Sequence, residues 1–461
     1  MKTLVVLAGV VAWIGSVSAA RELQSSQDAK PGLDASAKSV ERKPRPVPNA
    51  RLKARLATGV DVIGIVHWGL NTFTDKEWGY GDEDPKMLNP SAFDADQIVG
   101  AAKAGGIQGL VFVAKHHDGF CLWPTKTTEH NITKSPFRGG KGDYVKEMCE
   151  ACRRAGVRFG VYCSPWDRNN ADYGTPKYVE TYHAQIRELL GGAYGEIFEM
   201  WFDGANGGDG YYGGARETRK IPGDYYRFDK VFRFVRELQP NVCIFGMGGE
   251  FDWPGNEQGL VDQDRRAGDA QIFRMWEADF PLRPGWFYHE KERGRVRHGA
   301  FLMKLYLSSV GHGGIMDIGL APDRRGLLDD EDVTALRNFR TIKDAFFAKE
   351  ITGDGEPFNV VVLCENLDNG TQVDGWEYLA DGKAILSGKL IGAKQIRVLE
   401  NPVTAAKAEL RITADGGRLL PVTVRRYLAD PELVKLVLSA TSANGETDTA
   451  KWMTGREREK R

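Results

Sequence analysis

The sequence predicts an α/β protein, a (β/α)8-like TIM barrel with a C-terminal antiparallel β-sandwich domain. Three observations favour this fold. Short apolar runs alternate with amphipathic helical segments about every 40 residues, an order that implies parallel strands joined by helices. The early runs lack the glycine fingerprint of a nucleotide-binding sheet. From about residue 352 the pattern changes to short alternating runs separated by Gly, Asn and Asp, which predicts the sandwich.

The barrel elements follow one another in a regular order. The predicted strands are 63–68, 110–114, 157–163, 197–202, 242–247 and 315–320. The helices between them have start and stop signals: Asp143 is a candidate N-cap and Gly156 ends that helix, and Thr175 with Pro176 opens the next. Further helices are predicted near 231–238, 299–310 and 329–348.

The N-terminus is typical of a secretory signal peptide over residues 1–20. Lys2 precedes an apolar stretch, and small residues at 18–20 fit a cleavage site. This stretch is too short to span a membrane comfortably, so we expect an exported protein, secreted or periplasmic. Residues 21–48 are polar with four prolines and predict a flexible leader. The catalytic barrel is expected over 49–350 and the sandwich over 351–461.

The composition narrows the class of protein. A formal net charge of −1 over 461 residues gives no sign of a nucleic-acid or membrane-surface partner. The 6 cysteines are too few for a disulfide scaffold at this length. Cys149 and Cys152, three apart on a predicted helix, are interpreted as small buried hydrophobic residues. The sandwich has few aromatic residues beyond Trp376 and Tyr378, so we expect it to brace the barrel.

The residues that can carry chemistry follow the predicted strands. The apolar run 197–202 ends at Asp203, which puts a carboxylate where barrel enzymes place catalytic groups. Other polar and aromatic side chains follow the remaining strands: His67, Glu77, Trp78, His116, His117, Trp166, Glu250 and Glu257. Because strand ends meet at one face of a barrel, these groups should share one mouth. Carboxylates, imidazoles and flat aromatic faces suit the hydroxyls and C–H surfaces of a sugar.

A retaining glycosidase is the chemistry that fits these residues best. It needs a carboxylate nucleophile and a carboxylic acid about 5 Å apart. Asp203 on a rigid strand end suits the nucleophile. Either Glu257 or Glu250, on the following loop, suits the acid that later acts as a base.

A metal hydrolase built on His67, His116 and His117 is the rival chemistry. Adjacent histidines on a strand point to opposite faces, so His116 and His117 are not expected to share one metal. The sequence also contains neither HxH nor HExxH. We therefore expect no metal and no other cofactor.

Seven motifs carry a family resemblance and span about 60–345: HWGLNTF at 67–73, KEWG at 76–79, KHHDGF at 115–120, SPWDRN at 164–169, EMWFDGA at 199–205, GNEQG at 255–259 and PGWFYH at 284–289. Together they resemble the α-L-fucosidases of glycoside hydrolase family 29. The resemblance implies an exo-acting retaining enzyme that removes terminal α-L-fucose from glycans. SPWDRN and GNEQG resemble the branch that prefers α-1,3/1,4 linkages, although Asp252 precedes Trp253 where an arginine is typical.

The resemblance also implies roles for individual residues. Asp203 is the nucleophile and Glu257 the acid/base, with Glu250 as the reserve candidate. Five residues are expected to contact the fucose hydroxyls: His67, Glu77, Trp78, His116 and His117. Trp286 is expected as the aromatic wall on the sugar's methyl side, and Tyr162 and Trp166 as further contacts. Two alternatives remain open, namely the same machinery acting on another sugar such as a galactoside, and a carbohydrate-binding protein without catalysis.

Overall fold

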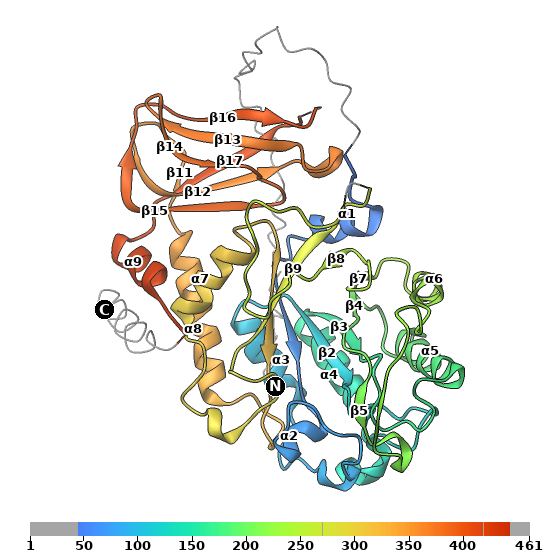
Figure 1. Ribbon diagram of the computed structural model, residues 1–461. Helices are drawn as coiled ribbons and strands as arrows, with labels where there is room; N and C mark the ends of the chain where they lie inside the picture. Colours follow the sequence, from blue (N-terminus) through green and yellow to red (C-terminus); the bar gives the residue numbers. More distant parts are fainter. Residues whose placement is uncertain (1–44, 270, 418, 443–461) are drawn as a thin grey trace, which may run out of the picture. The chain divides into compact units, whose positions relative to one another are not determined.

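The computed structural model describes residues 45–442 except 270 and 418, so the predicted signal peptide and nearly all of the predicted leader lie outside the described residues. Eight parallel strands close a barrel in the order β1-β10-β9-β8-β7-β4-β3-β2 (Figure 1). Their bounds are β1 Val62–Val66, β2 Gly109–Lys115, β3 Arg158–Cys163, β4 Glu199–Trp201, β7 Cys243–Phe245, β8 Phe251–Asp252, β9 Met275–Pro281 and β10 Ile315–Leu320. The predicted fold class is confirmed.

Helices surround this barrel, and five of them match the segments predicted to be helical. They are α1 Ala50–Ala57, α2 Leu70–Thr74, α3 Ala95–Ala104, α4 Tyr144–Ala155, α5 Pro176–Leu190, α6 Phe228–Leu238, α7 Gly299–Ser309 and α8 Asp330–Phe346. The Asp143 side chain accepts the Lys146 N–H and caps α4, which ends at Gly156 with a φ of 68°, a left-handed conformation that favours glycine. Thr175 precedes α5 but makes no side-chain cap; its hydroxyl donates to the Asp172 carbonyl instead.

Strands β8 and β9 were not predicted from the sequence. All seven residues of β9 are buried, but Glu277 and Asp279 interrupt its apolar pattern, so no apolar run marked it. No helix joins β8 to β9. The intervening residues 253–274 contain no regular element among those described, and Val261 from this segment packs on Trp276 and Ala278 of β9. A loop that begins at the mouth therefore covers part of the barrel.

The C-terminal sandwich consists of two antiparallel sheets. One contains β11 Glu350–Ile351, β17 Val422–Tyr427, β12 Pro357–Glu365 and β15 Gln395–Thr404; the other contains β14 Lys383–Gly388, β13 Val373–Ala380 and β16 Ala408–Asp415. Trp376 and Tyr378 are each 1% exposed in its core, where neither can stack on a ligand. Lys394 pairs with Asp61 at 2.8 Å, just before β1, so the sandwich meets the barrel at the N-terminal ends of the strands.

After the sandwich the chain returns to the barrel. Helix α9, Pro431–Ser439, buries Leu433, Val434 and Val437 in the same core cluster as the barrel helices. Lys304 of α7 donates to the carbonyls of Leu438 and Ala440, both at 2.9 Å. This helix was not predicted from the sequence, in which the sandwich was expected over the whole of 351–461.

The remaining elements are short. The loop after β4 contains a small hairpin of β5 Gly208–Gly210 and β6 Glu217–Arg219. Six 3-10 turns are described: η1 Pro85–Met87, η2 Ile132–Lys134, η3 Phe137–Gly140, η4 Tyr212–Gly214, η5 Glu290–Glu292 and η6 Leu367–Asn369. The six cysteines are free thiols, and all except Cys364 are buried, as interpreted for Cys149 and Cys152. No helix in the described part of the chain is long and apolar enough to cross a membrane.

Candidate active site

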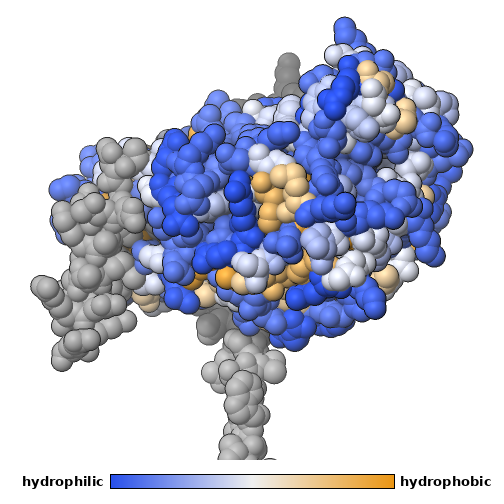
Figure 2. All heavy atoms as spheres, turned by 90° about the horizontal axis from the view of Figure 1, so that it is seen from below, coloured by the Kyte–Doolittle hydropathy of each residue, from blue (hydrophilic) through white to orange (hydrophobic). Residues whose placement is uncertain are grey.

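The candidate residues gather at the C-terminal ends of the barrel strands. His67 follows β1, His116 follows β2 and Asp203 follows β4. Figure 2 views the molecule from the side on which α2 lies in Figure 1; this face is largely hydrophilic, with an apolar area near its centre.

Asp203 lies two residues beyond β4, and its side chain is 23% exposed. Its Oδ2 accepts a hydrogen bond from the Tyr162 hydroxyl at 2.8 Å, and its Oδ1 accepts one from the Ala205 N–H at 2.6 Å. Burial, and secondly the charge of Asp203, raise the pKa of Tyr162 well above its ordinary value, so the phenol stays protonated and donates. Both carboxylate oxygens are thus held in fixed positions on a rigid strand end.

Three histidines cluster beside Asp203 and its hydrogen-bond partner Tyr162. Ring centroids lie 5.8 Å apart for His67 and His116 and 4.0 Å apart for His116 and His117. Burial lowers the pKa of His67 to about 3, and it also lowers the pKa values of His116 and His117. All three imidazoles are therefore neutral near pH 7, and each offers one N–H donor and one lone pair.

The expectation that His116 and His117 point to opposite faces is wrong. The pairing of β2 with β3 shifts register between Val113 and Lys115, and β2 ends at Lys115. The strict alternation of a strand therefore does not extend to the two histidines, and their rings lie against each other. Even so, no group of three or more His, Cys, Asp or Glu side chains within residues 45–442, gaps aside, has the geometry to hold a metal ion.

The hydrogen-bond network fixes the tautomer of His117. The Ser164 hydroxyl donates its only proton to the Trp166 carbonyl at 2.9 Å, so His117 Nδ1–H donates to Ser164 Oγ at 2.7 Å. Nε2 of the neutral ring then carries a lone pair and lies 3.8 Å from Asp203 Oδ2. A ligand hydroxyl placed beside Asp203 can therefore donate to Nε2.

Glu77 binds the loop that carries Trp286. Its carboxylate accepts hydrogen bonds from the backbone N–H of Trp286 at 2.9 Å and of Phe287 at 3.3 Å, and from Nε2 of His289 at 2.5 Å. The Trp286 ring lies 5.0 Å from His67, centroid to centroid. It also covers Gly319 of β10, where a Cβ would come within 2.7 Å of the indole. His289 was not predicted as a site residue, although it lies inside the PGWFYH motif.

Glu257 lies on the exposed loop after β8, next to Trp286. The indole N–H of Trp286 donates to Glu257 Oε2 at 3.3 Å. Asp279 lies inside β9, two residues before its end, and is close enough to Glu257 and Asp203 for their charges to act on it. Burial raises the pKa of Asp279 most, followed by the charge of Glu257 and more weakly that of Asp203, to about 7. The indole N–H of Trp253 donates to Asp279 Oδ1 at 2.9 Å, and 48% of Trp253 stays exposed. Sequence reasoning gave no role to Asp279 because β9 was not predicted.

The two remaining tryptophans lie on the other side of the histidines. Trp78 is 55% exposed, and its ring meets the His117 ring edge-on at 5.3 Å. Trp166 is 4% exposed and donates its indole N–H to the Tyr212 hydroxyl at 2.9 Å, while its ring lies 5.3 Å from His117. Trp78 is open to a ligand, whereas Trp166 supports His117 from behind.

Glu250, the reserve acid/base, is engaged elsewhere. It is 2% exposed and forms ion pairs with Arg236 at 2.7 Å and with Arg51 at 3.0 Å. Burial alone would raise the pKa of Glu250, but the hydrogen bond and charge of Arg236 outweigh burial and hold it below its ordinary value. A carboxylate locked in this way cannot donate a proton to a ligand, so the geometry favours Glu257.

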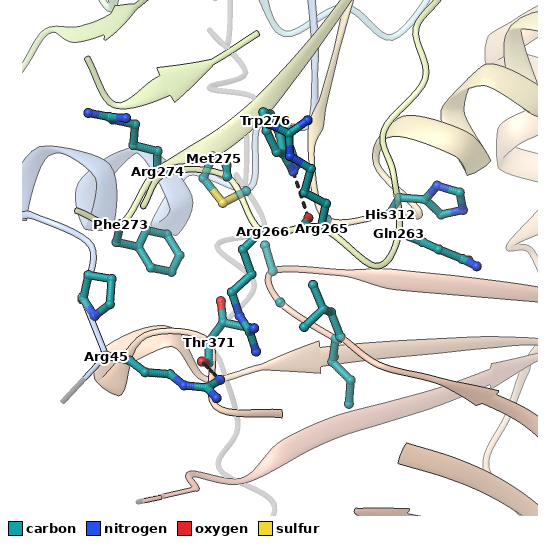
Figure 3. A pocket seen from close by; sticks show the side chains of 18 of the residues that line it. Arg45, Gln263, Arg265, Arg266, Phe273, Arg274, Met275, Trp276, His312 and Thr371 are labelled. Carbon is teal, nitrogen blue, oxygen red and sulfur yellow. Dashed lines mark hydrogen bonds between the residues drawn. The ribbon is translucent and has the colours of Figure 1, made fainter. Parts of the chain in front are cut away.

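A cavity of about 400 Å³ lies at the opposite end of the barrel, beside the sandwich (Figure 3). Met275 at the start of β9 and Gly313 just before β10 line it, together with Arg45 and Arg266. Both arginines pair with Asp374. No residue of the mouth described above lines this cavity, so it is separate from the candidate active site.

Residues 58–341 match the family model for alpha-L-fucosidase. The chain belongs to the alpha-L-fucosidase family. Within that family, Alpha-L-fucosidase 1 of Arabidopsis thaliana is 36% identical over 310 residues, which cover 62% of this chain and 58% of the relative. A rice relative is 36% identical over 333 residues, which cover 67% of this chain and 61% of the relative. The chain thus spans about 60% of the length of these curated relatives.

Solved structures of the alpha-L-fucosidase family share the fold. A glycoside hydrolase 29 family member from an unknown rumen bacterium superposes with a TM-score of 0.79 at 34% sequence identity, covering 84% of this chain and 78% of that one. The part of this chain that superposes, 84% of its length, is longer than residues 58–341, which the family model matches. The likeness in fold therefore includes part of the sandwich.

Proposed function

We propose that this protein is an exo-acting retaining α-L-fucosidase. The observation that carries the proposal is Asp203: a carboxylate fixed by Tyr162 and Ala205 at the end of a barrel strand, surrounded by neutral imidazoles. Membership of the alpha-L-fucosidase family supports the sugar specificity. The substrate of this chain, terminal α-L-fucose on a glycan, is part of the proposal.

The proposed reaction has two displacements at the anomeric carbon. Asp203 attacks C1 of fucose while the Glu257 carboxylic acid gives its proton to the leaving glycosidic oxygen, and a covalent fucosyl-enzyme results. Glu257, now a carboxylate, then removes a proton from water, whose oxygen attacks C1 and releases Asp203. The Tyr162 hydroxyl remains hydrogen-bonded to the nucleophile and keeps it aimed at C1.

The rest of the mouth matches the hydroxyl pattern and methyl group of fucose. His67, His116 and His117 are neutral and can accept or donate to the hydroxyls, and Glu77 offers acceptors. The Trp286 ring supplies an apolar wall for the methyl group. A hydrophobic wall of this kind favours a methyl over a hydroxymethyl group by at most about 100-fold, so fucosides should be preferred over the matching galactosides without excluding them.

The linkage preference and the compartment are also proposals. Glu257 on a GNEQG loop supports selectivity for α-1,3/1,4-linked fucose, and the exposed Trp253 ring lies on the same loop, where a leaving sugar can stack. The N-terminal sequence supports export. A fucosylated oligosaccharide or glycoconjugate is the proposed partner.

Hydrolysis of an aryl α-L-fucoside and of a Lewis-type trisaccharide tests this function. We expect fucose release from the trisaccharide, lost by several orders of magnitude in Asp203→Ala. In Glu257→Ala, azide should restore turnover of the aryl fucoside and give a fucosyl azide, because a small anion needs no general base. Near-normal activity of Asp203→Ala would sink the mechanism. Release of galactose but not fucose would move the assignment to a galactosidase, and tight sugar binding without turnover would leave a binding protein.

A further inference from the structure

His289 lies between two carboxylates from the facing loop. Its Nδ1 is 2.6 Å from Asp75 Oδ1 and its Nε2 is 2.5 Å from Glu77 Oε1. The imidazole itself is 4% exposed. A neutral imidazole has one N–H and cannot donate to both neighbours, whereas the imidazolium has two. The observed pair of short contacts is therefore complete only when His289 is protonated.

These contacts join the two loops that form the sugar pocket. Asp75 and Glu77 follow α2, next to Trp78, while His289 lies three residues after Trp286. Glu77 reinforces the junction by accepting the N–H groups of Trp286 and Phe287. At Gly285 a Cβ would come within 2.4 Å of Glu77 Oε1, so any side chain there would push the Glu77 carboxylate from its present position.

The charges around His289 favour the imidazolium. Burial alone would lower its pKa, but hydrogen bonds to Asp75 and Glu77 and the charges of Glu77 and Glu292 outweigh burial and raise the pKa above its ordinary value. Two cations also lie near Asp75, namely Lys291 on the loop of His289 and Arg324 after β10. The hydrogen bond to His289 lowers the pKa of Asp75 most, and the charges of Lys291 and Arg324 lower it further. When the ring loses a proton, one of the two carboxylates faces a lone pair, and the loops lose one of their bonds.

We propose that His289 is a positioning residue: as an imidazolium bridging Asp75 and Glu77, it fixes Glu77 and Trp286 in the sugar pocket, and its deprotonation loosens the binding of the sugar at alkaline pH. The inference rests on the proposed function, because it assumes that L-fucose binds at this mouth. It predicts a change in the affinity for the sugar, because His289 acts through Glu77 and Trp286, which line the sugar pocket.

Binding of L-fucose to the full-length protein, followed by calorimetry from pH 5.5 to pH 9.5, tests the inference. The wild-type affinity should fall on the alkaline side. Asp75→Asn keeps an oxygen acceptor beside Nδ1 but removes the charge, so the midpoint of this fall should move down by about one pH unit, the size of shift that a nearby opposite charge produces. His289→Gln should bind fucose about tenfold more weakly at pH 6, the cost of about one hydrogen bond, and should lack the midpoint that Asp75→Asn moves.

Glu290→Gln is the matched control. It removes one negative charge from the loop of His289, but Glu290 contacts Tyr288 and Arg293 instead of the imidazole, so the midpoint should stay at the wild-type value. The inference is overturned if Asp75→Asn has the wild-type midpoint, if Glu290→Gln shifts as far as Asp75→Asn, or if His289→Gln keeps both the affinity and the pH dependence. Absence of fucose binding by the wild type at every pH would instead overturn the proposed function.

Discussion

Replacing Asp279 with asparagine should stabilise the protein at alkaline pH and make its stability less dependent on pH. Asp279 is 4% exposed inside β9, and burial together with the charges of Glu257 and Asp203 raises its pKa from 3.8 to about 7. Asparagine keeps an oxygen that can accept the Trp253 N–H, so the substitution changes the charge and little else.

The size of the effect follows from the two pKa values. The folded state binds this proton more tightly than the unfolded state, so stability falls as pH rises from 3.8 to about 7 and then levels off. Between pH 5.5 and pH 8.5 the stability falls only until the pH reaches the folded-state pKa of about 7, which is a span of about 1.5 pH units. At 1.36 kcal/mol per unit, the loss of stability is about 2 kcal/mol. An unfolding entropy of about 2 cal/mol/K per residue converts this to about 2 °C for a chain of 461 residues.

Thermal denaturation of the wild type and Asp279→Asn at pH 5.5 and pH 8.5 measures the effect. The gap in melting temperature between the two proteins should widen by about 2 °C in favour of the variant at the higher pH. A gap that is the same at both pH values would refute the reasoning, because it would show that Asp279 carries no shifted proton. Ser164→Ala is a useful comparison, since it alters the same mouth without removing an ionisable group.

Three further predictions concern single substitutions. Gly319→Ala should lower kcat/KM on an aryl fucoside by about 100-fold, because the new Cβ displaces Trp286; Gly100→Ala, which meets no atom within 4 Å, should leave kcat/KM unchanged. Glu250→Gln should lower the free energy of unfolding by about 3 kcal/mol, because it removes the charge that pairs with Arg236. The kcat measured on folded protein should stay near the wild-type value. A large fall in kcat without a loss of stability would return Glu250 to the acid/base role. Trp376→Ala should cost about 3–5 kcal/mol of stability without changing the KM for fucosides, and a raised KM would show that the sandwich binds sugar.

The sequence predicted the fold class and the mouth because their signals are local. Asp203 ends an apolar run, and His67 and His116 follow runs of the same kind, so their positions could be inferred from strand ends alone. Strand β9 was missed for the opposite reason. Glu277 and Asp279 are buried acids inside it, and a pattern based on apolar residues interprets such a segment as a loop.

The rest of the site depends on contacts between distant segments. His289 and Glu77 are 212 positions apart, and nothing in either loop alone indicates that they meet. The register shift in β2 that brings His116 and His117 together is likewise set by pairing with β3. The GNEQG motif already favoured Glu257 over Glu250 in the sequence, but the ion pairs of Glu250 with Arg236 and Arg51, which set Glu250 aside, could not be inferred from it.

The position of helix α9 shows how the sandwich is connected to the barrel. The chain leaves the barrel after α8, builds both sheets and then returns to lay α9 on α7. The sandwich is thus an insertion between two helices that belong to the barrel layer, rather than a module added at the end. A truncation at residue 350 would strip an apolar cover from α7, and the exposed face would promote aggregation. An engineered barrel without the sandwich would need a short linker from α8 to α9, with α9 retained.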